Sequence, residues 1–125
     1  MHISIGTDIV NIHHFTKIVE NGEYSFLQKN YSGNELDYCF SKENAPSHLA
    51  GRFAGKEAVM KALYSHGLKP VPYKEIEILN DANGVPHIRI KINSYEKLKT
   101  KISLSHCEDK AIAFAIIYGD YENDE

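Results

Sequence analysis

Apolar and polar residues alternate at the start of the chain. Isoleucines occupy one face of the extended segment 3–10, and small or polar residues occupy the other, with Asp8 near its end. This alternation predicts a β-strand. Apolar residues then recur at helical spacing over residues 12–19, ahead of Asn21-Gly22, and predict a short amphipathic helix directly after the strand.

The segment 48–63, which follows Pro46, is predicted to form the longest helix. One stripe along this helix consists of the large apolar residues Leu49, Phe53, Met60 and Leu63. A second face consists of small residues, Ala50, Ala54, Ala58 and Ala62. We expect the large side chains to fill a core and the alanines to let another backbone approach. Lys56 falls within the stripe of large apolar residues, and we expect its side chain to extend its ammonium group out to water.

Shorter patterns complete the chain. Ser32 and Glu35 have the spacing of a capping box and predict another short helix. Apolar alternation on both sides of Asn83-Gly84 predicts a β-hairpin. The remaining predicted elements are a short helix over 93–98 and a final pair of strands over 102–105 and 111–118. We expect one domain over residues 1–118 and a frayed acidic tail over residues 119–125.

The length and composition of the chain exclude several classes of protein. A chain of 125 residues suits one domain, and its net charge of −3 argues against a generic nucleic-acid-binding protein. Cys39 and Cys107 lie far apart, without the spacing of a zinc site, and suit free thiols in a reducing compartment. No apolar run approaches the roughly 18 residues of a membrane span. We therefore expect a soluble, cytoplasmic protein with no membrane or nucleic-acid partner.

Asp8 and Glu57 are the candidate metal ligands. Together they could hold one magnesium ion, because this ion is typically bound by one or two carboxylates, with water and substrate phosphates completing its shell. Spacing alone leaves a structural alternative open for each residue. In place of binding a metal, Asp8 would cap the end of a strand, and Glu57 would form an ion pair with Lys61, four residues further along the same helix.

Three further basic residues are candidates for a role at the site. Lys61 lies one helical turn beyond Glu57 and could reach a phosphate bound to the same cation. Arg52 suits a bidentate phosphate contact, with a solvated helix surface as the alternative. His106 lies at the end of a predicted strand, from which an imidazole can reach a cleft, although most of the seven histidines must be ordinary surface residues.

Two segments together resemble a known family. Residues 5–10, Ile-Gly-Thr-Asp-Ile-Val, and residues 52–62, Arg-Phe-Ala-Gly-Lys-Glu-Ala-Val-Met-Lys-Ala, resemble the signature motifs of the holo-[acyl-carrier-protein] synthases, the short class of 4′-phosphopantetheinyl transferases. Residues 83–86 and 103–106 resemble later segments of that family. The resemblance implies an α+β protomer with an antiparallel sheet packed against a long helix, assembled as a homotrimer with sites between subunits.

The resemblance also implies an activity. The phosphopantetheine arm of coenzyme A would be transferred to a serine of apo acyl carrier protein, releasing adenosine 3′,5′-bisphosphate. Asp8 and Glu57 match the family's magnesium ligands, and manganese also suits such oxygen ligands. Lys61 matches a lysine that steadies the phosphates, so Glu57 and Lys61 are the expected catalytic residues. Arg52, Lys61 and His106 are expected to bind coenzyme A.

The sequence departs from the family pattern at the expected carrier-binding helix. His13 and His14 stand where arginines are common in relatives, so we expect His14 and Lys17 to bind the acidic carrier weakly or in a pH-dependent way. Asn11 replaces a common acid, and Tyr64-Ser-His-Gly67 replaces an expected glycine-rich turn. The alternative function is a noncatalytic module of the same fold that binds coenzyme A or a carrier protein.

Overall fold

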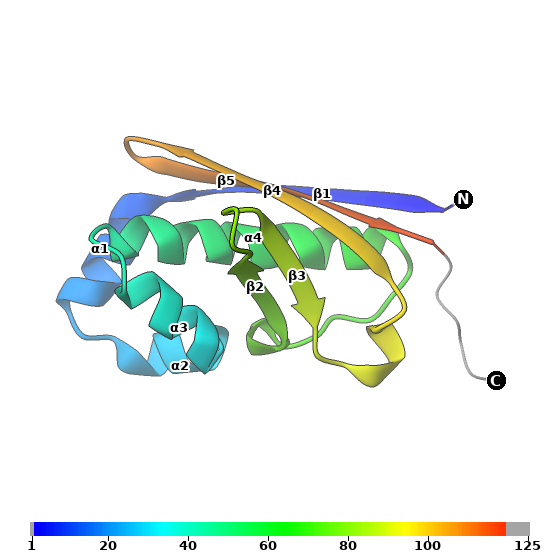
Figure 1. Cartoon of the computed structure of the whole chain (residues 1–125), viewed down its shortest axis with the longest axis horizontal. Helices are drawn as coiled ribbons and strands as arrows, with labels where there is room; N and C mark the ends of the chain where they lie inside the picture. The colour runs from blue at the N-terminus through cyan, green and yellow to red at the C-terminus, as the bar shows by residue number, and fades with distance from the viewer. Residues whose placement is uncertain (1, 120–125) are drawn as a thin grey trace.

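A long helix lies between a β-sheet on one side and a layer of helices and a hairpin on the other (Figure 1). The computed structural model describes residues 2–119. The sheet is antiparallel, with strand order β1 (Ile3–Asn11), β5 (Lys110–Tyr118), β4 (Lys99–Cys107), and it packs on α4 (Ala45–Ser65). The second layer and connections are α1 (Ile12–Glu20), α2 (Tyr24–Asn30), α3 (Gly33–Phe40), β2 (Ile76–Asn80), β3 (Pro86–Ile90) and the 3-10 turns η1 (Tyr73–Glu75) and η2 (Asn93–Tyr95). The predicted α+β fold is confirmed.

The small residues of α4 bring the helix close to the sheet. Ala54, Ala58 and Ala62 are completely buried. A Cβ atom added at Gly6 on β1 would lie only 1.9 Å from the carbonyl oxygen of Ala58, so only glycine fits there. The large residues of α4 lie in hydrophobic clusters, with Leu49 beside the first helices and Leu63 beside the hairpin. The predicted helix with two buried faces is therefore confirmed.

The structure departs from the predicted elements in several places. Helix α4 begins at Ala45, with Pro46 in its first turn, and strand β4 starts three residues earlier than predicted. Helix α2 was not predicted because it buries only Leu27 and has no side-chain cap. The predicted helix over 93–98 is only the short turn η2. The predicted tail, apart from Gly119, lies outside the described residues.

The prediction that Lys56 reaches water is wrong. Its side chain is completely buried, and its Nζ lies 2.7 Å from Oε1 of Glu35, which is also completely buried. Glu35 belongs to the capping box of α3, whose predicted reciprocal hydrogen bonds with Ser32 are present. The partner of Lys56 therefore comes from a different helix, 21 residues away, and no periodic pattern along α4 could indicate it.

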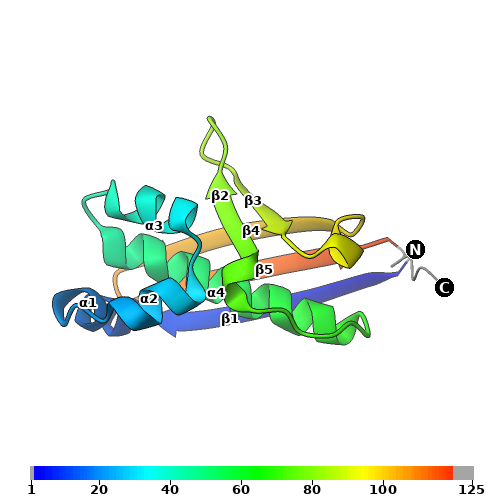
Figure 2. The ribbon, with the colours of Figure 1, turned by 90° about the horizontal axis from the view of Figure 1, so that it is seen from below.

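The β2–β3 hairpin stands away from the body of the molecule (Figure 2). Its tip is the predicted Asn83-Gly84 turn, in which Gly84 adopts a φ of +81°. Oδ1 of Asp81 accepts hydrogen bonds from the backbone N–H groups of Asn83 (2.8 Å) and Val85 (3.0 Å). Nε2 of His87 lies 2.9 Å from Oδ2 of Asp81. These contacts give the hairpin tip a defined shape.

The outer face of the sheet is apolar and exposed. Ile3, Ile5 and Ile9 of β1 are each more than half exposed, because the face with Ser4, Gly6 and Asp8 packs on α4. On β5, Ile112 and Phe114 continue this face next to β1. Among residues 2–119, no helix combines the length and the hydrophobicity that crossing a membrane requires.

Candidate functional site

Strand β1 and helix α4 bring Asp8 and Lys61 together. Oδ1 of Asp8 lies 3.2 Å from Nζ of Lys61, which also donates a hydrogen bond to the carbonyl oxygen of Thr7 at 2.9 Å. The Asp8 side chain is 17% exposed and that of Lys61 56%, so the pair lies at the rim of the packed layers. Within the described residues no ion pair joins Glu57 to Lys61, so the alternative of a simple intrahelical pair is wrong.

Glu57 lies one turn before Lys61 on α4, and its charge acts on a residue that the sequence did not indicate. The phenol of Tyr73, in η1, lies within the electrostatic influence of the Glu57 carboxylate. Burial of the phenol, together with the negative charges of Glu57 and Asp8, raises the pKa of Tyr73 above its usual value. Asp8 and Glu57, which are 49 positions apart in the chain, thus act on the same phenol.

The donor set at this place fits a hard divalent cation. Two carboxylates from separate elements supply oxygen ligands, which magnesium and manganese prefer. Asp8 and Glu57 are both only partly buried, so their oxygens remain accessible to a ligand. The Lys61 ammonium group adds a positive charge beside them, where it could neutralise a phosphate oxygen.

A second part of the candidate site is a cavity of about 160 Å³ between α4, the hairpin and β4. Of the three residues expected to bind coenzyme A, Arg52 and His106 line this cavity and Lys61 does not. It is also lined by Ser47, His48, Asn80, Gly84 and Pro86. The hairpin tip therefore closes one side of the cavity, while α4 supplies the charged side.

Arg52 is buried rather than solvated at a helix surface, with only 2% of the residue exposed. Its guanidinium carbon lies 4.5 Å from the centre of the Tyr38 ring, and Nη2 donates a hydrogen bond to Oδ1 of Asn80 at 2.9 Å. Nδ2 of Asn80 in turn donates to the Tyr38 hydroxyl at 3.0 Å. Asn80 and Tyr38 thus hold the guanidinium in one orientation.

The Nε–H group of Arg52 is buried and has no hydrogen-bond partner within residues 2–119. An unpaired buried donor on a charged group is costly, and an anion in the adjacent cavity would satisfy it. Burial and the positive charges of Arg52, Lys42 and His106 lower the pKa of His48, so its imidazole is largely uncharged at neutral pH. Arg52 is therefore the permanent positive charge of this cavity.

His14 and Lys17 lie elsewhere, on the exposed side of α1. The His14 ring contacts Phe15 and Phe26 edge-on, with ring centres 5.3 and 6.5 Å apart. Both predicted carrier-binding residues are accessible, as a docking surface requires. Asn11 is also exposed, at the junction of β1 and α1.

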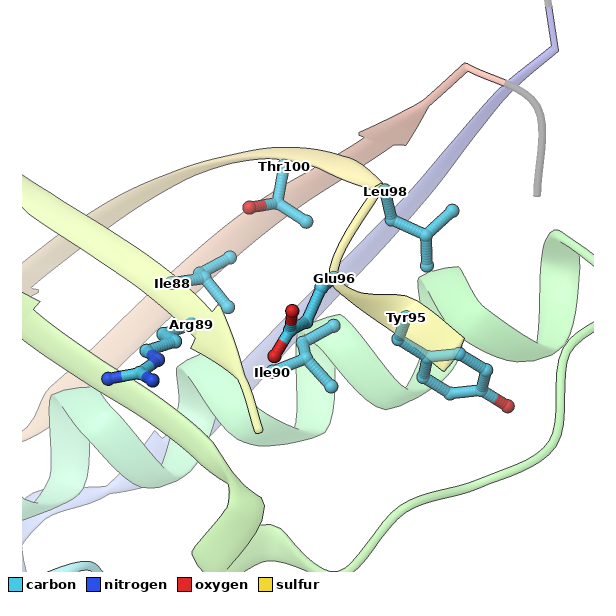
Figure 3. A pocket seen from close by; sticks show the side chains of 7 residues that line it. All are labelled: Ile88, Arg89, Ile90, Tyr95, Glu96, Leu98 and Thr100. Carbon is cyan, nitrogen blue, oxygen red and sulfur yellow. The ribbon is translucent and has the colours of Figure 1, made fainter. Parts of the chain in front are cut away.

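Another cavity, of about 310 Å³, lies between β3, η2 and the start of β4 (Figure 3). None of the predicted site residues lines it. Its walls are formed by Ile88, Arg89, Ile90, Tyr95, Glu96, Leu98 and Thr100.

Sequence reasoning missed Tyr73, His48 and Asn80. Tyr73 lies in a proline-rich connection with no periodic pattern, and Asn80 ends a hairpin strand, so neither position carried a signal of its own. His48 was visible only as one more histidine at the start of the long helix. Its spacing of four residues from Arg52 places both on one face of α4, which was the available signal.

Comparison with known proteins supports a single family. Residues 4–116 match the family model of the 4′-phosphopantetheinyl transferase superfamily. A holo-[acyl-carrier-protein] synthase of Protochlamydia amoebophila is 39% identical over 119 residues, which cover 93% of this chain and 98% of the relative. That of Thermodesulfovibrio yellowstonii is 42% identical over 113 residues, covering 90% and 96%.

Solved structures of holo-[acyl-carrier-protein] synthases also match this chain. The holo-[acyl-carrier-protein] synthase of Helicobacter pylori in complex with coenzyme A is 30% identical, with a TM-score of 0.77 and coverage of 91% of this chain and 99% of that one. An ACPS-CoA complex from Chronobacterium ammoniagenes is 27% identical, with a TM-score of 0.79 and coverage of 98% and 100%. The chain therefore belongs to the 4′-phosphopantetheinyl transferase superfamily, among the holo-[acyl-carrier-protein] synthases.

Proposed function

We propose that this protein is a holo-[acyl-carrier-protein] synthase, which transfers 4′-phosphopantetheine from coenzyme A to a serine of apo acyl carrier protein. The serine oxygen forms a bond to the phosphorus that carries pantetheine, and the pyrophosphate bond breaks. Adenosine 3′,5′-bisphosphate leaves, and the serine proton passes to solvent. The observation that carries the proposal is the convergence of Asp8, Glu57 and Lys61 at one place between β1 and α4.

Asp8 and Glu57 would hold a magnesium ion, for which manganese could substitute. When bound, that ion supplies charge stabilisation at the pyrophosphate. The two carboxylates fix its position by approaching from different elements.

Lys61 would act directly on the phosphate oxygens. Its ammonium group is more than half exposed and is held by Asp8 and the Thr7 carbonyl oxygen. These two contacts orient it toward the site instead of leaving it free in solvent. A fixed positive charge stabilises the negative charge that develops on the leaving phosphate as the bond breaks.

Arg52 and His106 would bind a phosphate of coenzyme A in the 160 Å³ cavity. The unpaired Nε–H of Arg52 supports this assignment, because a phosphate oxygen would supply its missing acceptor. The Tyr38 ring and Asn80 hold the guanidinium in place before the ligand arrives. Such preorganisation reduces the entropic cost of binding.

The carrier protein would dock on the exposed side of α1, at His14 and Lys17. Both side chains are accessible there, and a positive charge on either would attract an acidic partner.

The active assembly would be a homotrimer of single-domain protomers. The support is the exposed apolar sheet face on β1 and β5, since a patch of this kind typically marks an interface. We place the enzyme in the cytoplasm. Cys39 and Cys107 are free thiols in the structure, as expected in a reducing compartment.

The test is incubation of the purified protein with coenzyme A, magnesium and an apo acyl carrier protein, followed by intact-mass measurement of the carrier. We expect addition of one phosphopantetheine group, and no addition after the metal is chelated. Calorimetric binding of coenzyme A is measured in parallel. Coenzyme A binding without transfer to any of several carriers would instead support the noncatalytic binding module.

A further inference from the structure

The tip of the β2–β3 hairpin forms one wall of the cavity of about 160 Å³ that Arg52 lines. Asn80, Gly84 and Pro86 are the hairpin residues of this wall, and α4 and β4 supply the others. Asn80 also accepts the hydrogen bond from Nη2 of Arg52 at 2.9 Å. The conformation of the tip therefore determines both the shape of the wall and the support of the guanidinium group.

The last pair of residues in the hairpin, Asp81 and Val85, is joined partly through a side chain. In a regular antiparallel pair, the two residues exchange both of their backbone hydrogen bonds. The Asp81 N–H group donates to the Val85 carbonyl oxygen at 2.8 Å, as in such a pair. The Asp81 carbonyl oxygen instead accepts from the N–H group of Gly84 at 3.0 Å, and the Val85 N–H group donates to Oδ1 of Asp81. The carboxylate thus takes the place of a backbone carbonyl group.

The same carboxylate makes two further contacts in the tip. Oδ1 also accepts from the backbone N–H group of Asn83 at 2.8 Å, and Oδ2 accepts from Nε2–H of His87 at 2.9 Å. His87 belongs to β3, so the Asp81 side chain joins the turn to the strand that follows it. The hydrogen bond from His87, followed by that from Val85, lowers the pKa of Asp81 below its ordinary value, so the group stays an ionised acceptor at neutral pH.

The tip is exposed to solvent. Residues 81–85 are all exposed, and the hairpin projects from the rest of the protein (Figure 2). Gly84 has a φ of +81°, but glycine adopts either sign of φ about equally well, so this residue does not fix the turn by itself. Without the carboxylate, the N–H groups of Asn83 and Val85 would turn to water. The tip would then sample several conformations, and a ligand would have to order it on binding.

We propose that Asp81 is a positioning residue for coenzyme A, because it holds the hairpin tip in the conformation that forms a wall of the cavity beside Arg52. This inference rests on the proposed function, since it takes coenzyme A as the ligand of that cavity. Asp81 does not line the cavity itself and acts through Asn80, Gly84 and Pro86. A tip that is already ordered lowers the entropic cost of ligand binding and leaves the transfer step at the metal ligands unaffected.

The test compares Asp81→Ala with Asp81→Asn. Alanine removes both oxygens, whereas asparagine keeps Oδ1 as an acceptor for the N–H groups of Asn83 and Val85. Coenzyme A binding is measured by calorimetry, and transfer by intact mass of the carrier. For Asp81→Ala we expect about tenfold weaker binding and a matching rise in the KM for coenzyme A, with kcat within about twofold of the wild type. Asp81→Asn should bind coenzyme A within about twofold of the wild type, because these hydrogen bonds remain.

Asp109→Ala is the matched control. Asp109 is an exposed aspartate in the turn between β4 and β5, pairs with Lys110 at 2.9 Å and does not line the cavity. This variant should bind coenzyme A as the wild type does. Equal coenzyme A binding by the wild type and Asp81→Ala would overturn the inference and leave the proposed function intact. Equal losses in Asp81→Ala and Asp81→Asn would also overturn it, because asparagine retains the acceptor. Absence of coenzyme A binding by the wild type would overturn both the inference and the proposed function.

Discussion

At the scale of single residues, burial decides which charged groups have a defined role. Arg52 and Lys56 are both buried cations on α4, yet within residues 2–119 only Lys56 has an anionic partner. Every donor of Lys56 is paired, and it supports neighbouring structure. Arg52 keeps an unpaired donor beside a cavity, which is the pattern expected of a residue that awaits an anionic ligand.

This contrast leads to a prediction for Arg52→Lys. Lysine keeps the charge but loses the planar fork, the stacking on Tyr38 and the Nε–H donor. We expect about tenfold weaker binding of coenzyme A, measured by calorimetry, which corresponds to about 1.4 kcal/mol. The matched control is Arg89→Lys, at an exposed arginine that does not line this cavity. Equal affinities for wild type and Arg52→Lys would show that Arg52 does not contact the ligand.

The sequence indicated the identity of the main site residues, but not their surroundings. Asp8, Glu57 and Lys61 could be assigned by motif resemblance, and the structure brings Lys61 to Asp8. The environment of Lys56 was predicted wrongly, because its partner Glu35 lies on a different helix. The influence of Glu57 on the Tyr73 phenol depends in the same way on how two distant segments pack. Contacts of this type have no periodicity along the chain.

At the scale of elements, the close packing of β1 on α4 positions the candidate metal ligands. The small residues Gly6 and Ala58 let the strand approach the helix. Asp8 lies two residues after Gly6 on β1, and Glu57 directly precedes Ala58 on α4. The two-faced pattern of α4 was predictable because it is local and periodic. Helix α2 and the turn η1 were not, since each is short and depends on contacts with the rest of the fold.

The packing of β1 on α4 predicts a large effect of Gly6→Ala. The added Cβ would lie 1.9 Å from a backbone oxygen, so the strand must move away from the helix. We expect a loss of about 3 kcal/mol or more in the free energy of unfolding, measured with urea, together with reduced transfer activity.

Gly51→Ala is the control for the Gly6 prediction. Gly51 lies within α4, and an added Cβ atom would meet no other atom within 4 Å there. Alanine favours a helix over glycine by up to about 1 kcal/mol. We therefore expect this second glycine-to-alanine change to be neutral or stabilising. A Gly6→Ala protein as stable as the wild type would contradict the close packing of β1 on α4.

At the scale of the whole molecule, the distribution of apolar surface points to assembly. One face of the sheet is buried on α4, and the opposite face presents isoleucines on β1 beside Ile112 and Phe114 on β5. In the cross-strand register, Ile5 lies opposite Ile116 and Ile9 opposite Ile112. Side chains paired in this way form a continuous apolar surface, which a monomer would leave in contact with water.

Ile5→Lys tests this interface. Ile5 is 54% exposed in the protomer, so lysine is tolerated there if the protein is a monomer. In a trimer that buries this face, the charge is expected to prevent association. Light scattering should show three chains for the wild type and one for the variant. Tyr24→Lys, at an exposed aromatic residue on α2, should remain a trimer. A monomeric wild type, or a trimeric Ile5→Lys, would contradict the proposed assembly.

The most direct test of the central claim is the rate of phosphopantetheine transfer by Glu57→Gln, followed by intact mass of the carrier. Glutamine keeps the size of the side chain and removes the negative charge that would hold the cation. We expect transfer to fall by about 100-fold or more relative to wild type. Glu43→Gln, at an exposed glutamate just before α4, should transfer at the wild-type rate. Wild-type rates from Glu57→Gln would contradict the account of how this site works.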